Sequence, residues 1–440
     1  MIKKIFSVFL VTLLAQILSI FSISYIYNRN PDESFLNTIA ILDSTFSIVT
    51  SVLAFGMLQI TTRNIVTNKE WEKEVSETQN IRMSFAFYIS ILSLILYFFL
   101  EKPLFLYFTT SIFIANNVNY ALYGLGKSLQ ASVSSSLRLI INALGLLLMG
   151  YFCVYNSLFY FILFSITILI TSIYSNFLLK AKFQFKLIND FYKSYLITFK
   201  IGITDLAIVF LLDTGILFFA DFFYEEHAIT NAYIVLKIYL LIKGVQRLVF
   251  QTFYNELVNI KKVILLNKII FIIGVVYFVA TVLYTNEVAS FIFGKISESA
   301  LLNFKISGFS VIISSILLAS IPRTLVIKND KIYFNSFVLS LFFLLSSMII
   351  LSFTRYKDNG IFIALLIGEF VLFLSFFIGI WKDLKIRKYK KFYLMNFLLL
   401  VVYFLLNKYL ETEFAILVSI VINVVYGFYF IFFNKKELMS

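Results

Sequence analysis

Cysteine, histidine, proline and charged residues are all scarce in this sequence of 440 residues. The single cysteine, Cys153, excludes an internal disulfide bond. The single histidine, His227, excludes a histidine metal cluster and a Ser-His hydrolase with a second base. Charged residues make up 14% of the chain, whereas a soluble domain has about a quarter. A disulfide scaffold, zinc chemistry and a soluble fold are therefore not expected.

Glycine and proline are also few, with 15 and 3 residues. This scarcity argues against a transporter built on several broken helices. Only Pro322 is placed to kink a predicted helix, because Pro31 and Pro103 fall in predicted turns. No glycine-rich loop followed by Lys-Ser or Lys-Thr is present, so we expect no ATP hydrolysis. We expect no cofactor, no resident metal and no nucleic-acid partner.

Apolar residues, in contrast, are abundant at 60% of the chain. A membrane-spanning helix needs about 20 of them, so this content would fill roughly 13 spans and leave little chain for a soluble domain. The sequence therefore predicts an all-α polytopic membrane protein of about 14 transmembrane helices. The predicted spans are 5–27, 36–62, 83–101, 104–126, 133–151, 157–179, 201–223, 230–258, 263–284, 301–327, 332–353, 360–381, 392–406 and 414–433.

The distribution of lysine and arginine predicts the orientation. With the N-terminus in the cytoplasm, 27 of these residues fall on the cytoplasmic side, including Lys127 and Arg138, and 6 fall outside. Basic residues near helix ends are retained on the cytoplasmic side, so this count favours an even number of spans with both termini cytoplasmic.

Segment 180–200 interrupts the series of spans with a basic, aromatic stretch. Its apolar residues follow helical spacing, as in Ile188, Tyr192 and Tyr195, and lysines such as Lys193 add positive charge. This pattern predicts an interfacial amphipathic helix on the anionic inner leaflet, and a plain basic linker is the alternative.

The two sides of this segment begin alike. Segment 5–62 is followed by Arg63, and segment 201–247 ends at Arg247, each with a glycine and a glutamine shortly before the arginine. Such a repeat predicts two pseudo-symmetric six-helix lobes around a central cavity that holds the substrate. The predicted parts are an N-terminal lobe, a connector, a C-terminal lobe and two additional helices, at 1–180, 181–200, 201–391 and 392–440.

Three stretches carry a resemblance to a known family: AFGMLQITTRNI at 54–65, YALYGLGKSLQASVSSSLRLIINALGLLL at 120–148 and LLDTGILFFADFFYEEHAITNAYIVLKI at 211–238. They resemble the polysaccharide flippases of the Wzx type, in the superfamily that includes the MATE drug exporters and the lipid II flippase. The resemblance implies transfer of an undecaprenyl-diphosphate-linked oligosaccharide, such as an O-antigen or capsule unit, to the outer leaflet of the bacterial inner membrane. It also implies contact with membrane lipids and with a glycan polymerase or chain-length regulator.

Several ionisable residues fall inside predicted spans, where a charge costs about 2.5–3.5 kcal/mol. They are Asp43, Asp205, Asp213, Asp221, Lys237, Lys243, Arg247, Lys305 and Glu369. At ~1.5 Å per residue, Lys237 lies at the depth of Asp213, and Arg247 at that of Asp205. Lys243 is then left without an acid on the neighbouring helix. Two readings stay open: ion pairs between helices, or a hydrated cavity whose cations hold a diphosphate.

A second polar patch has Asn116, Asn119, Tyr120 and Tyr123 at the spacing of one helix face. Amide and phenol groups suit sugar hydroxyls, and bonding between helices explains them equally well. The candidate substrate-binding residues are thus Lys237, Lys243, Arg247, Lys305, Arg63, Asn116, Asn119, Tyr120 and Tyr123. The candidate coupling or charge-compensating residues are Asp43, Asp205, Asp213 and Glu369.

Two other functions compete with the flippase. A MATE-like exporter of small cations needs an acidic site, whereas segment 205–247 contains bases as well as acids. A membrane enzyme that polymerises or ligates glycans needs a sizeable external loop, and the predicted loops are short. We therefore expect a transporter and not an enzyme. If Lys243 faces the cavity, Lys243→Ala should accumulate normally and lose export.

Overall fold

The computed structural model describes residues 2–29, 33–67, 70–101, 103–180, 186–252, 257, 259–294, 296–327, 329–380 and 387–433. Every regular element in these ranges is a helix. Eleven helices are long and apolar enough to cross a membrane, and the count is twelve if one bent pair forms a single span. The all-α polytopic membrane fold is therefore confirmed. Two predicted spans are not in that count: 104–126, which is split into short helices, and 414–433, whose described apolar part is short.

The chain separates into two compact units, Met1–Tyr233 and Ile234–Ser440. The division lies within one long helix, beyond the predicted connector, because the segment after the connector packs on the first helices of unit 1. The assignment of lobes to 1–180 and 201–391 stays a prediction. The helices of unit 1 are α1 (Ile2–Arg29), α2 (Glu33–Ala54), α3 (Met57–Thr67), α4 (Trp71–Leu100), α5 (Pro103–Tyr107), η1 (Phe108–Thr110), α6 (Ser111–Ala115), α7 (Asn119–Gly124), α8 (Ser128–Tyr151), α9 (Ser157–Leu179), α10 (Phe191–Ile197), α11 (Phe199–Leu212), α12 (Gly215–Ala220) and the start of α13 (Glu226–Thr252).

Small side chains allow the long helices of unit 1 to approach closely. A Cβ atom on Gly150 of α8 would lie 2.9 Å from the ring of Tyr25 on α1, and these two helices run side by side. Gly145 of α8 is similarly close to Leu163 of α9. Since hydrocarbon tails supply little driving force for helix association, such close packing is what holds membrane helices together.

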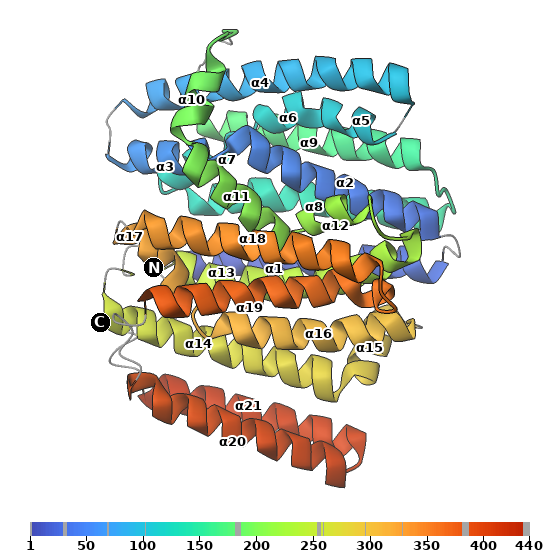
Figure 1. Cartoon of the computed structure of the whole chain (residues 1–440), viewed down its shortest axis with the longest axis vertical. Coiled ribbons are helices and arrows are strands. Elements are labelled where there is room, and N and C mark those ends of the chain that lie inside the picture. The colour runs from blue at the N-terminus through green and yellow to red at the C-terminus, as the bar shows by residue number, and fades with distance from the viewer. Residues whose placement is uncertain are drawn as a thin grey trace. The chain divides into compact units, whose positions relative to one another are not determined.

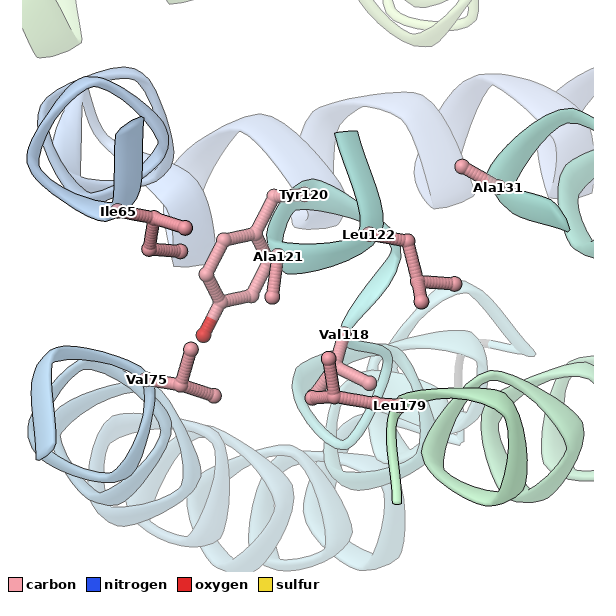
Figure 2. Packing of buried hydrophobic residues seen from close by; sticks show 8 residues of the cluster. All are labelled: Ile65, Val75, Val118, Tyr120, Ala121, Leu122, Ala131 and Leu179. Carbon is pink, nitrogen blue, oxygen red and sulfur yellow. The ribbon is translucent and has the colours of Figure 1, made fainter. Parts of the chain in front are cut away.

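One apolar cluster joins five helices of unit 1 (Figure 2). The ring of Tyr120 from α7 lies between Ile65 of α3 and Val75 of α4, and Leu179 from the end of α9 packs nearby. Ala131 brings α8 into the same cluster. The six-residue helix α7 is thus stabilised by packing against its neighbours, because a helix this short has little stability of its own.

Three predicted spans of unit 1 are broken, contrary to the expectation from glycine and proline content. The span at 36–62 divides at Phe55 and Gly56, both with positive φ; 104–126 is interrupted at Asn116; and 201–223 divides at Asp213. In each case a polar side chain satisfies the freed backbone groups, which lets a helix break at membrane depth. The predicted repeat differs here, since Gly244 lies inside the unbroken α13.

The break after α6 is held by Arg82 of α4. This side chain is 2% exposed and donates to the carbonyl oxygens of Asn117 at 2.9 Å and Ile114 at 3.2 Å. Its guanidinium also donates to Gln79, whose amide donates to the carbonyl of Ala115. The arginine therefore supplies the hydrogen bonds that the helix end lacks, and its charge is favoured by the negative end of the helix dipole.

The predicted amphipathic helix at 180–200 is shorter in the structure. Residues 181–185 lie outside the described part, and α10 covers Phe191–Ile197 only. It meets α11 at an angle of 79°, so α10 crosses the direction of the long helices (Figure 1).

Unit 2 contains the rest of α13 and the following helices. They are α14 (Ile260–Phe278), a π-helical turn η3 (Val279–Leu283), α15 (Thr285–Phe293), α16 (Glu298–Ser315), α17 (Ser320–Val326), α18 (Asp330–Ser352), η4 (Lys357–Asn359), α19 (Gly360–Ile380), α20 (Arg387–Tyr409) and α21 (Thr412–Phe433). Helices α18 and α19 run side by side (Figure 1). The helix is interrupted between Ser315 and Ser320, ahead of Pro322, where Asn267 accepts a hydrogen bond from the backbone of Ala319 at 2.8 Å. The kink at Pro322 itself stays a prediction.

The last two helices form a hairpin on one side of unit 2 (Figure 1). Tyr403 of α20 and Ala415 of α21 pack in a cluster with Phe271 of α14, and Tyr284 bonds Ser419 at 2.9 Å. Only 11% of the apolar window of α20 is buried in the molecule. The hairpin is therefore attached along one face and leaves most of α20 for lipid.

Candidate functional site

A first group of polar side chains surrounds Asp43 in the middle of α2. The Asp43 carboxylate is buried and accepts a hydrogen bond from the Tyr233 hydroxyl at 2.6 Å. The Thr214 hydroxyl donates to the main-chain oxygen of Asp43 at 3.1 Å and lies 2.9 Å from the hydroxyl of Ser47. These contacts join α2 to the break between α11 and α12 and to the start of α13. Asp43, a predicted coupling or charge-compensating residue, is thus buried and hydrogen-bonded in the core of unit 1.

Arg138 lies close to this group and has a different character. It is ten residues into α8, about 15 Å from the start of a helix about 36 Å long, and is only half-buried. Its guanidinium carbon lies 4.1 Å from the ring centre of Phe46. Both Arg138 and Asp43 act electrostatically on the phenols of Tyr160 and Tyr233. Among the residues that the structure describes, Arg138 forms no ion pair.

Asp205 on α11 holds the break between α2 and α3. Its carboxylate accepts from the main-chain N–H of Gly56 at 3.0 Å and from the side-chain amide of Gln59 at 2.5 Å. A carboxylate at this point caps the first turn of α3, where N–H groups lack partners in the helix. Asp205 therefore has a structural task at the break.

The second buried polar group lies in unit 2 around Glu369 of α19. Glu369 is 1% exposed, and its Oε1 accepts from Lys243 Nζ at 2.6 Å and from the Tyr239 hydroxyl at 2.5 Å. Its Oε2 accepts from Ser310 at 2.6 Å, and Lys243 also donates to Ser314. Acid and base are thus hydrogen-bonded across α13, α16 and α19, which offsets the cost of burying the ion pair.

This pair corrects the prediction for Lys243. The depth comparison paired only neighbouring helices and left Lys243 without an acid, whereas Glu369 comes from a helix more than a hundred residues later. Lys243 is therefore ion-paired in this structure, and its role in binding substrate stays a prediction. The predicted pairs of Lys237 with Asp213 and of Arg247 with Asp205 would each join one unit to the other, and they stay predictions.

The remaining charged candidates are spread over both units. Lys237 and Arg247 are half-buried on α13, and Lys305 is exposed on α16, outside the Glu369 group. Asp213 bonds the backbone N–H of Thr214 at 2.7 Å. Asp221 is exposed at the end of α12, and Arg63 lies on α3 with a side chain outside the described part.

The asparagine and tyrosine patch is not one helix face, contrary to its spacing, because the chain breaks at Asn116. Asn116 donates to Ser172 at 3.1 Å, and Asn119 donates to Ser135 at 3.1 Å. Tyr120 is buried in the apolar cluster, while Tyr123 is 46% exposed. The contacts within unit 1 therefore explain these residues as links between helices, and a role in binding sugar stays a prediction.

Two arginines lie inside helices where the sequence predicts none. The sequence predicts Arg138 on the cytoplasmic side and Arg82 just before a span, but both lie well inside α8 and α4. The serine-rich segment 128–136 and the polar segment 71–82 have the composition of loops. The predicted spans therefore begin several residues after the helices do. Without the two arginines the cytoplasmic count is 25 against 6, so the predicted orientation is unaffected. Within the described ranges no group of three or more His, Cys, Asp or Glu residues could hold a metal ion.

No model of a known protein family matches the sequence, and no curated protein matches it. Solved structures do resemble the chain. The lipid II flippase MurJ in an inward closed conformation matches with a TM-score of 0.71 at 18% identity, over 98% of this chain and 99% of that chain. A multidrug resistance MATE family transporter of the MOP superfamily, in its inward-facing conformation, matches with a TM-score of 0.59 at 14% identity, over 87% and 99%.

A eukaryotic MATE transporter matches with a TM-score of 0.52 at 14% identity, over 86% of this chain and 95% of that chain. At these identities the likeness is one of fold. The predicted MATE-like architecture is therefore confirmed, and the polysaccharide flippase remains a prediction. The chain is a multi-pass membrane protein with the fold that the lipid II flippase and the MATE transporters of the MOP superfamily share.

Proposed function

We propose that this chain is a flippase that moves an undecaprenyl-diphosphate-linked oligosaccharide from the cytoplasmic to the outer leaflet by alternating access. It resides in the bacterial cytoplasmic membrane with both termini in the cytoplasm. It forms and breaks no covalent bond of its substrate. Its glycan product passes to a polymerase and a chain-length regulator on the outer side.

The observation that carries this proposal is the unpaired guanidinium of Arg138. An arginine at mid-span costs several kcal/mol unless it meets an acid, water or a ligand, and among the described residues it forms no ion pair. The nearest acid, Asp43, acts on the same phenols but accepts its hydrogen bond from Tyr233. A diphosphate carries two negative charges and matches the planar, two-pronged donor set of arginine. Arg138 is therefore the residue to which we assign the diphosphate, in place of Lys243.

The state of the acids also favours an anionic substrate. Asp43 is bonded by Tyr233, Asp205 by Gly56 and Gln59, and Glu369 by Lys243. A site for small organic cations needs a carboxylate that is accessible to the ligand. These three acids are already engaged inside their own units, so the exporter of small cations has less support.

The extent of the fold likeness supports a lipid-linked substrate. The match to the lipid II flippase covers 98% of the chain, whereas the MATE match covers 87% and leaves out about 57 residues. That number is close to the 54 residues from position 387 to the end, which hold α20 and α21. An additional helix pair beside a lipid flippase suits a substrate with a long hydrocarbon tail.

The test uses the full-length protein in vesicles that contain fluorescent undecaprenyl-diphosphate-linked glycan. A membrane-impermeant reductant bleaches the label on one leaflet, so transfer between leaflets is read as the bleached fraction, with proton and sodium gradients of both signs. We expect transfer by the wild type, at least a tenfold loss in Arg138→Gln and partial activity in Arg138→Lys, all at equal protein levels. Glycan that stays in place while ethidium is transported would replace the flippase by the cation exporter.

A further inference from the structure

The short helix α10 presents an unusual outer face for a segment between two spans. Four apolar side chains on α10 and at the elbow with α11 are exposed: Tyr192 at 50%, Leu196 at 66%, Ile197 at 83% and Phe199 at 49%. The helix meets α11 at 79°, so it lies nearly across the direction of the spans (Figure 1). An apolar face on a helix in that orientation fits the boundary between lipid headgroups and acyl chains.

The inner face of α10 is firmly attached to unit 1. Phe191 stacks on Phe85 of α4 at 5.3 Å, and Tyr195 lies edge-on to the same ring at 4.8 Å. The approach to the helix is also held, because the backbone N–H of Lys186 donates to Asn80 at 3.0 Å and that of Ile188 to Ser84 at 2.8 Å. The outer face is therefore displayed by a rigid support and is not a loose loop.

Positive charge borders the apolar face. Lys186 and Lys200 are exposed and form no ion pair with any residue the structure describes. Lys193 is also exposed, and its partner Asp190 at 2.6 Å is the only acid between positions 186 and 200. Glu77 on α4 lies one helical turn before Asn80, which accepts from the backbone N–H of Lys186, so two acids, Asp190 and Glu77, lie near three lysines. The border thus keeps a net positive charge.

We infer that α10 is a docking surface for the anionic phospholipid headgroups of the leaflet at this end of unit 1. The apolar side chains enter the acyl boundary, and Lys186, Lys193 and Lys200 contact the headgroup phosphates. Clusters of lysine beside an interfacial helix attract anionic lipids in this way.

The support of α10 also contacts the break between α2 and α3. Phe55, at the break between α2 and α3, packs on Tyr195 at 5.7 Å and on Phe199 at 6.1 Å. The Tyr195 hydroxyl also donates to the carbonyl of Leu53 at 3.2 Å. Headgroups that hold α10 in place therefore also hold the elbow that supports this break.

The experiment places a fluorescent reporter on α10 of the full-length protein, in a background in which Trp71 and Trp381 are replaced by phenylalanine. Leu196→Trp is read in vesicles of phosphatidylcholine with 30% phosphatidylglycerol, where either one lipid or the other is brominated and quenches nearby tryptophan. We expect quenching per brominated lipid to be at least twofold stronger with the anionic lipid. The ratio of quenching by the anionic lipid to quenching by phosphatidylcholine should fall to one in the triple variant Lys186→Gln, Lys193→Gln, Lys200→Gln. It should also fall to one in high salt.

The matched control is Phe99→Trp, at the other end of α4, which is 81% exposed and has none of these lysines nearby. It should be quenched equally by both lipids. Absence of quenching at position 196 would place α10 in water and overturn the inference. Equal quenching by both lipids, or a preference that survives the triple variant, would overturn the role of the lysines. Neither measurement involves transport, so the outcome is independent of the proposed function.

Discussion

Two cations in this molecule illustrate what membrane burial demands of a charged residue. Lys243 is 4% exposed and bonds Glu369, whereas Arg138 is half-buried and forms no ion pair with a residue that the structure describes. The first arrangement supports helix packing and the second is suited to a ligand. Charge alone, as read from the sequence, cannot separate the two, because the separation depends on which distant helix supplies a partner.

The buried pair gives a prediction opposite to the one made from sequence. In Lys243→Ala the Glu369 carboxylate stays buried without its cation, which should cost about 3–5 kcal/mol and lower the amount of folded protein in the membrane. The double variant Lys243→Met, Glu369→Gln removes both charges and should recover most of that loss. Protein level and the temperature of half-unfolding in detergent measure this. Lys305→Ala, at an exposed position on α16, is the control and should leave both unchanged.

If Lys243→Ala accumulates normally and only transport fails, the pair is functional and the structural assignment is wrong. A double variant as unstable as the single variant would show that the loss of stability comes from altered packing around Glu369 and not from the unpaired charge.

At the scale of helices, the sequence predicts the spans well and their breaks poorly. The length of the apolar runs locates the long helices, because each span needs about 20 mostly apolar residues to cross the hydrocarbon core. The breaks depend on side chains from other helices, as with Asp205 on the N–H of Gly56 and Arg82 on the carbonyl of Asn117. A count of glycine and proline cannot reveal such support, since the partner lies 35 to 149 residues away.

The break between α2 and α3 offers a test at this scale. Gly56 has φ of +79°, and a Cβ atom there would lie 2.8 Å from Ile201 and 3.1 Å from the backbone nitrogen of Gly202. Gly56→Ala should therefore cost about 2–4 kcal/mol, from the left-handed conformation and from the clash. Gly126→Ala is the matched control, with φ of +70° and nothing within 4 Å, and should cost only about 1 kcal/mol.

The temperature of half-unfolding, followed by fluorescence-detected size exclusion, compares the two glycine variants directly. Equal shifts for Gly56→Ala and Gly126→Ala would mean that the elbow moves aside without penalty and that the break is not a tightly packed joint.

At the scale of the molecule, the positive charge on one side of the spans is the most robust feature of the sequence. It survives the correction of Arg82 and Arg138, because loop lysines and not membrane arginines dominate the count. The division into two units and the attachment of the C-terminal hairpin depend on tertiary contacts. The weak repeat in the sequence does not predict these contacts. The hairpin on α14, for example, depends on aromatic and hydroxyl contacts such as Tyr284 with Ser419.

The orientation can be tested on the protein without any change, because its only cysteine is exposed. Cys153 lies in the turn between α8 and α9, which the charge count places on the outer side. A membrane-impermeant maleimide should therefore label the wild type in intact cells. In a Cys153→Ser background, Glu226→Cys should also be labelled from outside, and Lys127→Cys, exposed at the other end of α8, only after permeabilisation. Labelling of Lys127→Cys but not of Cys153 in intact cells would invert the proposed orientation, and with it the direction in which a flippase of this chain would present its substrate.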